Sequence, residues 1–475
     1  MNDADRSPSP LEPLLSPEGW QLLNSLPPYS EADSLTLNQR LRKQGHSPEL
    51  VAAALTQSSL RAEAVAKFGE FAEKMLFTRD GLQQATRLPV AARHAQRFRE
   101  AGLTHAADLG CGLGGDTMAL ASLGLNVIAV EADETTAAAA TVNLMAFPEA
   151  EVLHTTAEEF MDQHGPLPEG WGLWLDPARR DAGRGHTRSG SASRVWDPEA
   201  FSPPLSFVTG LAETGIPMGV KMGPGIPHEL IPEGCEAEWV SDGGDVVEVV
   251  LWFNALARHV SSDEADAEPS ATSRTVISRA ATVLHSGEEG RRAVELTYAS
   301  GWNTAAGTTA APDAGADTEA DGVTSTARLP TPDEILYEPD GAVIRAGLVQ
   351  DCAAAFGGEL LDEHIAYFVT AEPYAGDPAP LARGYRVEHV MDFNVKILQR
   401  WAQEESVTSL EIKKRGVDIV PEQLRQQVLS GTKSAKKTAS GKKTSGKRAK
   451  ASKVHRTLVL VRIGEERIAA VVQPL

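Results

Sequence analysis

The sequence THAADLGCGLGGDTMALASLGLNVIAVEAD, residues 104–133, decides the fold. It begins with a short apolar segment that ends at Asp108, and a helical segment and a β-rich segment ending at Glu131 come later. Between the first two lies a turn whose glycines are Gly110, Gly112, Gly114 and Gly115. The order strand, glycine-rich loop, helix, strand and acid is typical of one half of a nucleotide-binding α/β sheet.

The residue types of this turn suit a bound ligand. Glycine allows the backbone to turn tightly and to approach a ligand closely. The helix that follows points its free N–H groups at the ligand. Glu131 lies roughly 20 residues after the first glycine, where an acid meets ribose hydroxyls in such folds. The stretch therefore predicts a cofactor site, and a turn without any ligand is the plain alternative.

Two cofactors fit the spacing. Gly110, Gly112 and Gly115 match G-x-G-x-x-G, which accommodates the pyrophosphate of a dinucleotide. S-adenosylmethionine (SAM) brings a sulfonium and an amino acid instead, and it has no phosphate. Asp108, two residues before the first glycine, suits a cationic methionine end and would repel a pyrophosphate. The sequence therefore favours SAM, and a nicotinamide-dependent oxidoreductase stays as an alternative.

The motif Asp108-x-Gly110-x-Gly112 followed by Glu131 resembles the SAM-binding motifs of class I methyltransferases. The wider chain resembles bacterial methyltransferase-like proteins with a C-terminal THUMP-like domain. The stretches that carry this resemblance are KFG at Lys67–Gly69, QATR at Gln84–Arg87, DPARRD at Asp176–Asp181 and LEIKKRG at Leu410–Gly416. The resemblance implies an α/β fold: a Rossmann-like class I methyltransferase sheet, an N-terminal helical region and a small C-terminal α/β domain.

The resemblance also implies cofactor contacts. They are Asp108, Gly110, Gly112, Gly114, Asp116, Glu131 and Ala157. Many class I enzymes place an acid before an alanine to hold the adenine amino group, whereas this chain has Thr155-Thr156-Ala157-Glu158 there. The adenine contact is therefore left open. Arg79 and Arg87 are candidates for the methionine carboxylate, with exposed helix charges as the alternative.

The predicted fourth strand, Gly172–Leu175, runs into Asp176-Pro177-Ala178-Arg179. Ligands bind outside the carboxyl ends of strands in such sheets, so this segment is expected beside the transferable methyl group. It resembles the D-P-P-x motif of amino- and RNA-methylating enzymes. Asp176 would accept a hydrogen bond from an amine, Pro177 would stiffen the backbone, and Arg179 would meet a phosphate. These three residues are the candidate catalytic residues, and a turn or capping role is the alternative for Asp176.

Two further patterns concern the same sheet. Lys221 ends the predicted fifth strand, Met218–Lys221, and is expected to be a strand-end charge rather than an active-site cation. Ala237–Ser241 and Val246–Phe253 alternate around Asp-Gly-Gly and predict a hairpin. Class I methyltransferases close their sheet with such an antiparallel pair, whereas classical dehydrogenase sheets do not, so the hairpin favours SAM.

The C-terminal stretch has the order βαβαββ, which suits the THUMP-like domain. Lys413, Lys414 and Arg415 at a strand end are expected to bind substrate phosphates, with a solvated charge cluster as the alternative. Residues 433–453 form a basic, flexible insertion without aromatic residues for base stacking.

Composition sets the limits of the interpretation. With 475 residues the chain is long enough for two or three domains, and its net charge of −20 argues against a wholly basic nucleic-acid binder. There is no apolar run of membrane-span length, and the N-terminus does not resemble a signal peptide. The cysteines form no evident disulfide framework, which fits a reducing cytoplasm. The three widely spaced cysteines predict no metal site. The oligomeric state is not indicated.

The predicted organisation has five parts: a disordered start (1–10), a helical region (11–100), a SAM-binding domain (101–260), a connecting region (261–384) and the THUMP-like domain (385–475). The helical region is predicted to contain helices over 48–55 and 59–76. The connecting region is predicted to contain a disordered insertion (299–328) and a helix over 343–356.

The leading hypothesis is a SAM-dependent methyltransferase acting on RNA. A base nitrogen is favoured over uracil C5, because C5 methylation needs a cysteine nucleophile and none lies in or just after the Asp176 motif. A catalytically inactive RNA-binding protein with the same fold is the alternative, and an NAD-dependent oxidoreductase is the third hypothesis.

Overall fold

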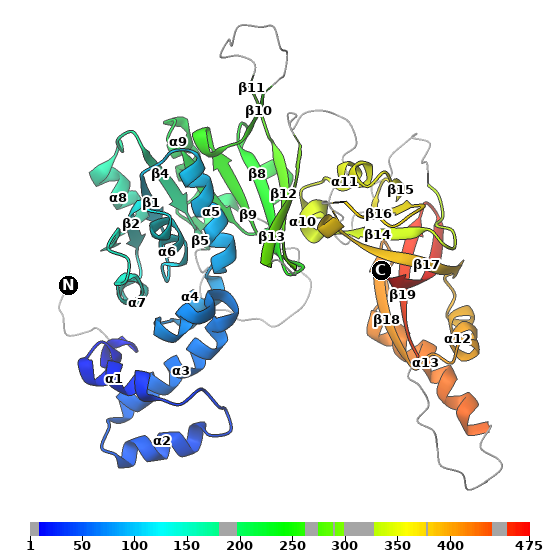
Figure 1. Cartoon of the computed structure of the whole chain (residues 1–475), viewed down its shortest axis with the longest axis horizontal. Helices are drawn as coiled ribbons and strands as arrows, with labels where there is room; N and C mark the ends of the chain where they lie inside the picture. The colour runs from blue at the N-terminus through cyan, green and yellow to red at the C-terminus, as the bar shows by residue number, and fades with distance from the viewer. Residues whose placement is uncertain are drawn as a thin grey trace. The chain divides into compact units, whose positions relative to one another are not determined.

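The computed structural model describes residues 9–179, 197–261, 274–287, 290–298, 327–376, 379–438 and 454–475. The chain divides into two compact units (Figure 1): residues 1–237 with 249–276, and residues 238–248 with 277–475. Several predictions fall wholly or partly outside the described residues: the disordered start, Arg180 and Asp181, the insertion 299–328 and most of the basic run 433–453.

The first unit begins with helices. They are α1 (Pro17–Ser25), α2 (Ser34–Lys43), α3 (Pro48–Phe68), α4 (Arg79–Gln84) and α5 (Leu88–Glu100). The hydroxyls of Ser16, Ser47 and Thr78 accept backbone N–H groups at the starts of α1, α3 and α4, as N-cap residues do. The predicted break near residue 56 was wrong, because no glycine or proline interrupts α3 before Gly69, whose φ of 55° suits glycine.

A mainly parallel sheet forms the body of this unit. Its strand order is β9-β7-β4-β1-β2-β3, and only β9 runs antiparallel to its neighbour. The strands are β1 (His105–Leu109), β2 (Asn126–Glu131), β3 (Ala150–His154), β4 (Trp171–Leu175), β7 (Met218–Met222) and β9 (Asp245–Phe253). The chain turns in opposite directions from β1 and from β4, and a ligand crevice is expected at the carboxyl ends of these two strands.

Helices and short strands complete the first unit. The helices are α6 (Gly115–Ser122), α7 (Glu134–Leu144), α8 (Ala157–His164) and α9 (Leu205–Glu213), and the short strands are β5 (Ala178–Arg179), β6 (Phe201–Ser202), β10 (His259–Ser261) and β11 (Arg274–Val276). One buried cluster joins the N-terminal helices to α7, because Leu22, Val51 and Leu144 all belong to it. The predicted hairpin is present as β8 (Glu236–Asp242) and β9.

The buried Asn143 side chain adds polar contacts to this packing. Its Oδ1 accepts the N–H of Leu76 at 2.7 Å, and its Nδ2 donates to the carbonyls of Leu76 and Leu113, both at 3.0 Å. Helix α7 is thereby bonded both to the N-terminal region and to the glycine-rich loop.

The second unit contains an antiparallel pair and a seven-stranded sheet. The pair is β12 (Arg279–Gly287) and β13 (Gly290–Tyr298). The sheet has the order β15-β16-β14-β17-β20-β19-β18. Its strands are β14 (Ile335–Pro339), β15 (Glu359–Asp362), β16 (Ile365–Thr370), β17 (Ala382–Asp392), β18 (Ser409–Arg415), β19 (His455–Ile463) and β20 (Glu466–Pro474).

The helices of this unit are α10 (Gly341–Arg345), α11 (Val349–Ala355), α12 (Val395–Glu404) and α13 (Pro421–Thr438). From β17 onward the order is βαβαββ, as predicted. The predicted helix over 343–356 is in fact two helices, separated at Gly347 with its φ of 68°. Strands β14–β16 belong to the same sheet, so the stretch expected as a connection contributes to it. Helix α13 continues to Thr438, into the run expected to be flexible, where lysine and alanine favour helix.

Within the described ranges, no helix is both long and apolar enough to cross a bilayer.

Candidate functional site

The glycine-rich loop leaves strand β1 after Asp108 and Leu109. The φ values of Gly110, Gly112 and Gly114 are 95°, 55° and 85°, which other residues adopt only with strain. The N–H groups of residues 110 and 111 both donate to the Val130 carbonyl at 2.9 Å. A Cβ atom on Gly112 would meet nothing within 4 Å, so the bend is open on that side and can admit a ligand.

Glu131 faces the bend from the end of β2. Its Oε2 accepts the backbone N–H of Gly112 at 3.0 Å, and its Oε1 accepts the N–H of Asp133 at 2.8 Å. Burial raises the pKa of Glu131, although the backbone N–H donors oppose that shift. A carboxylate offers about four acceptor positions, so the geometry leaves acceptor capacity for ribose hydroxyls.

Asp108 is buried directly before the loop. Its Oδ2 accepts the hydroxyl of Thr117 at 2.5 Å, whereas its Oδ1 has no hydrogen-bond partner among the described residues. Burial, together with the negative charges of nearby carboxylates, raises the pKa of Asp108 well above its usual range. A buried acceptor without a partner is costly, and a cationic group would relieve that cost. This site therefore fits the positively charged end of SAM.

Asp116 lies in the first turn of α6 and is bonded to another side chain. Its Oδ1 lies 2.7 Å from Nδ1 of His94, which stacks on the ring of Trp174 at 4.1 Å. Burial alone would raise the pKa of Asp116, but the contact with His94 and the charge of Lys221 outweigh it, so the pKa is lowered. Asp116, one of the predicted cofactor contacts, is therefore already paired with His94 within the protein.

Asp176 follows β4 and adjoins the loop. A Cβ atom on Gly110 would lie 3.1 Å from the carbonyl oxygen of Asp176, so the two predicted motifs are in close contact. The Asp176 carboxylate forms an ion pair with Lys221, whose Nζ lies 2.5 Å from Oδ2. The expectation that Lys221 is merely a strand-end charge was wrong, because the neighbouring strands β4 and β7 bring it to the predicted catalytic acid.

The remaining predicted residues of this site differ in how far they are buried. Pro177 is buried, and Arg179 lies in the short strand β5, its side chain outside the described parts. Ala157 is the buried first residue of α8, which Thr156 caps. Arg79 is exposed, whereas Arg87 is half-buried at the start of α5.

Sequence reasoning assigned no role to Lys67 or Thr86, which the structure places around Lys221. The KFG and QATR stretches, which carried the family resemblance, contain both of them and were the available signal. These two residues belong to the N-terminal region, so that region contributes side chains to the site.

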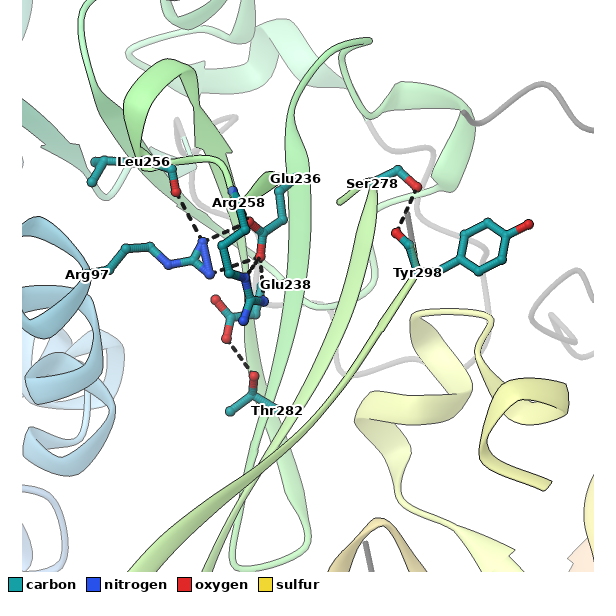
Figure 2. A network of polar contacts seen from close by, with 8 residues as sticks. All are labelled: Arg97, Glu236, Glu238, Leu256, Arg258, Ser278, Thr282 and Tyr298. Carbon is teal, nitrogen blue, oxygen red and sulfur yellow. Dashed lines mark hydrogen bonds and ion pairs between the residues drawn. The ribbon is translucent and has the colours of Figure 1, made fainter. Parts of the chain in front are cut away.

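A second buried polar network supports the sheet on the side of α5 (Figure 2). Glu236 is fully buried, and its carboxylate accepts hydrogen bonds from Arg97 at 2.9 Å and from Arg258 at 2.6 Å. The guanidinium of Arg97 also stacks over the ring of Trp252 at 4.4 Å. This network joins α5 to β8 and the segment after β9, and we assign it a structural role.

The three predicted phosphate-binding residues of the second unit differ in how strongly they are engaged by contacts within the protein. Lys413 donates to Oε2 of Glu338 at 2.8 Å and lies over the ring of Tyr385 at 5.4 Å. Arg415 lies 3.8 Å from Oε1 of Glu338. Lys414 is exposed and donates to the Ile419 carbonyl at 2.8 Å. Of the three, Lys414 is therefore the most available to a phosphate, and Lys413 is largely occupied within the sheet.

No group of three or more histidine, cysteine, aspartate or glutamate side chains suited to a metal ion occurs in the described part of the chain.

Comparison with known proteins agrees with this geometry. Residues 382–474 match a family model described as THUMP domain-like, and residues 8–64 match a domain of unknown function. Proteins from two strains of Mycobacterium tuberculosis, each named an uncharacterized S-adenosylmethionine-dependent methyltransferase, are 29% identical over 406 residues. The matches cover 82% of this chain and 91% of theirs.

A solved structure from Porphyromonas gingivalis W83, described as a candidate methyltransferase, has the same fold. The TM-score is 0.60 at 17% identity, and the match covers 94% of this chain and 99% of that one. The predicted fold is thereby confirmed: a class I methyltransferase sheet with N-terminal helices and a C-terminal THUMP-like domain. The chain is thus similar in sequence to two proteins named S-adenosylmethionine-dependent methyltransferases, and it shares the fold of a solved structure described as a methyltransferase.

Proposed function

We propose that the protein transfers the methyl group of SAM to a base nitrogen of RNA. The observation that carries the proposal is the contact between the two motifs. The glycine-rich loop after Asp108, which Glu131 faces, contacts the Asp176 segment directly at the carboxyl edge of the sheet. A cofactor held by the loop would present its reactive group to that segment.

Each residue has a defined part in this proposal. Glu131 binds the ribose, and the loop from Asp108 to Gly114 binds the methionine end. The buried Oδ1 of Asp108, which has no hydrogen-bond partner among the described residues, would face the positive charge of that end. When bound, SAM supplies a methyl group that its sulfonium already activates. Asp176 accepts a hydrogen bond from the acceptor amine, and Pro177 stiffens the segment, so the rate gain comes mainly from alignment. Arg179 is proposed to meet a substrate phosphate.

The cysteines support nitrogen over carbon as the acceptor. Methylation at uracil C5 requires a thiolate nucleophile. All three cysteines are buried, and burial raises the pKa of Cys235 and of Cys352 to about 12. Burial also raises the pKa of Cys111 well above its usual range. Thiols of this kind stay protonated and unreactive at neutral pH.

RNA as substrate is supported by the THUMP-like domain and by local basic charge. The chain is acidic overall, so contacts with a polyanion must be local. Among the predicted phosphate-binding residues, Lys414 on β18 is the best placed, and the sequence of residues 433–453 adds basic charge.

The test has two arms. Mass spectrometry of nucleosides from total RNA, with and without the protein in cells, should reveal one methylated nucleoside that depends on it. In vitro, Asp176→Ala should leave SAM affinity unchanged by calorimetry and lower methyl transfer, whereas Asp162→Ala, at an exposed site on α8, should change neither. Equal turnover in wild type and Asp176→Ala would refute the assignment of the acceptor site.

A catalytically inactive RNA-binding protein is the second candidate. Two departures favour it: Ala178 replaces the second proline of the motif, and no acid precedes Ala157. RNA binding without detectable SAM binding would establish this reading. A clear preference for NADH over SAM in a titration would instead establish the oxidoreductase.

A further inference from the structure

Two lysines hold a short segment, Gln83–Thr86, which comprises the last two residues of α4 and the start of the connection to α5; we call it the linker segment. The first is Lys67, near the end of α3. Its Nζ donates to the carbonyl oxygens of Gln83 and Ala85, both at 2.7 Å. Carbonyls at the C-terminal end of a helix lack intrahelical donors and favour cations, so this contact is chemically matched.

The second lysine, Lys221, binds the linker segment from the sheet. Its Nζ donates to the Gln84 carbonyl at 3.2 Å and to the Thr86 hydroxyl at 3.1 Å. Its shortest contact is with Asp176, at 2.5 Å. One ammonium group therefore connects the proposed catalytic acid to a segment about 90 residues earlier in the chain.

The linker segment also touches the cofactor loop. A Cβ atom on Gly115 would lie 3.7 Å from the Thr86 carbonyl oxygen. The Thr86 side chain is buried and forms a hydrogen bond with Asp116 in the first turn of α6. The linker segment therefore packs against the start of α6, directly after the proposed SAM-binding loop, and the two lysines hold it there.

Several cations gather near Asp176. Lys67, Lys221 and Arg87 are close enough to influence one another. Burial, together with the charges of Lys221 and Arg87, lowers the pKa of Lys67 to about 8, although the charge of Asp176 opposes the shift. Asp176 and Asp116 are two negative charges that interact with these cations: Asp176 with Lys67 and Lys221, and Asp116 with Lys221.

We propose that Lys221 is a positioning residue for methyl transfer: it holds the Asp176 carboxylate ionised and in place, and it ties that carboxylate to the linker segment, with Lys67 as a second tether. This inference rests on the proposed function. It makes the N-terminal helical region part of the site rather than an accessory to it.

The first test needs no enzymatic activity. Hydrogen exchange followed by mass spectrometry measures opening of the linker segment, where the Ala85 N–H donates to the Gly81 carbonyl at 2.8 Å. Lys221→Met and Lys67→Met should each speed exchange of this amide at least about tenfold, because each variant loses two hydrogen bonds to the linker segment. Lys74→Met, at an exposed site, is the control and should match wild type. Unchanged exchange in both variants would refute the tether.

The second test is the pH profile of methyl transfer from radiolabelled SAM to RNA from cells lacking the protein. Lys221→Met removes the cation that is paired with the Asp176 carboxylate, so the acid limb of kcat/KM should move to higher pH. Lys221→Met should therefore lose more activity at pH 6 than at pH 8.5, and Lys221→Arg should restore the wild-type profile. A uniform loss at every pH, without rescue by arginine, would show that Lys221 only stabilises the fold.

The two tests separate the two claims. If wild type transfers no methyl group to any RNA, the proposed function fails, and with it the role of Lys221 in transfer. The exchange result still decides whether the tether exists.

Discussion

The carboxylate of Glu131, at the end of β2, accepts a hydrogen bond from the backbone N–H of Gly112 in the glycine-rich loop, at 3.0 Å. The acid at the end of β2 therefore both shapes the loop and remains beside the open space that Gly112 borders. Replacing it should affect the ligand more than the fold.

We predict that Glu131→Ala weakens SAM binding about 10- to 100-fold, because hydrogen bonds to charged groups contribute about 1.5–3 kcal/mol. Calorimetric titration with SAM is the measurement. Glu149→Ala, an exposed glutamate before β3, is the matched control and should bind SAM as wild type does. Wild-type affinity in Glu131→Ala would mean that the ribose site lies elsewhere.

Asp108→Asn should stabilise the ligand-free protein at neutral pH while weakening SAM binding. Burial raises the pKa of Asp108 in the folded state, so the unfolded chain gives up this proton at lower pH than the folded one. The stability that depends on this group is therefore fully present below the unfolded pKa, near 3.8, and is lost as the pH rises through the folded pKa.

Thermal unfolding of wild type and Asp108→Asn between pH 4 and pH 8 checks this sign. The difference in Tm should be small near pH 4 and should grow toward pH 8, with the variant the more stable. SAM should raise the Tm of wild type much more than that of the variant. A variant less stable than wild type at pH 8 would contradict the buried-carboxylate account.

Lys413→Ala and Lys414→Ala should act on different properties. The Lys413 side chain is 17% exposed and paired with Glu338, so its loss should lower stability by about 1–3 kcal/mol. Burial lowers the pKa of Lys413, but the interactions with Glu338 and Tyr385 together outweigh it, so the folded pKa is raised. The stability from this group is therefore present at neutral pH and lost only at strongly alkaline pH.

Lys414→Ala should leave stability unchanged and weaken RNA binding. Removing one phosphate contact should reduce the slope of log K against log salt by about 0.7–0.9. Filter binding over a range of salt concentrations measures the slope, and chemical denaturation measures the stability. The reverse pattern would place the RNA contact at Lys413.

Glu236→Ala should destabilise the first unit by about 3–5 kcal/mol, because it leaves Arg97 and Arg258 without their buried counter-charge. Calorimetric unfolding should show the loss. Glu233→Ala, an exposed glutamate three residues earlier, should unfold like wild type. A small effect at Glu236 would mean that water replaces the carboxylate.

The cofactor loop could be predicted from sequence because its determinants are local. Positive φ at Gly110, Gly112 and Gly114 needs glycine, and the distance to Glu131 along the chain is set by one helix and one strand. These residues lie where the spacing indicated.

The role of Lys221 could not be read in this way. Its partners lie at Asp176, Gln84 and Thr86, 45 to 137 residues away, and no periodicity connects them. Lys413 is a similar case, since Glu338 lies 75 residues earlier in a strand that composition did not reveal. Ion pairs between distant segments depend on tertiary packing, which a single sequence does not encode in a visible pattern.

The shared core of the N-terminal helices and α7 bears on how the chain can be divided. Leu22 and Val51, within the stretch matched by a domain of unknown function, pack in the same cluster as Leu144. Deleting that stretch would expose the apolar side chains of α7 that now pack against it. We therefore expect the N-terminal helices to fold together with α7, as one core, and not as an independent module.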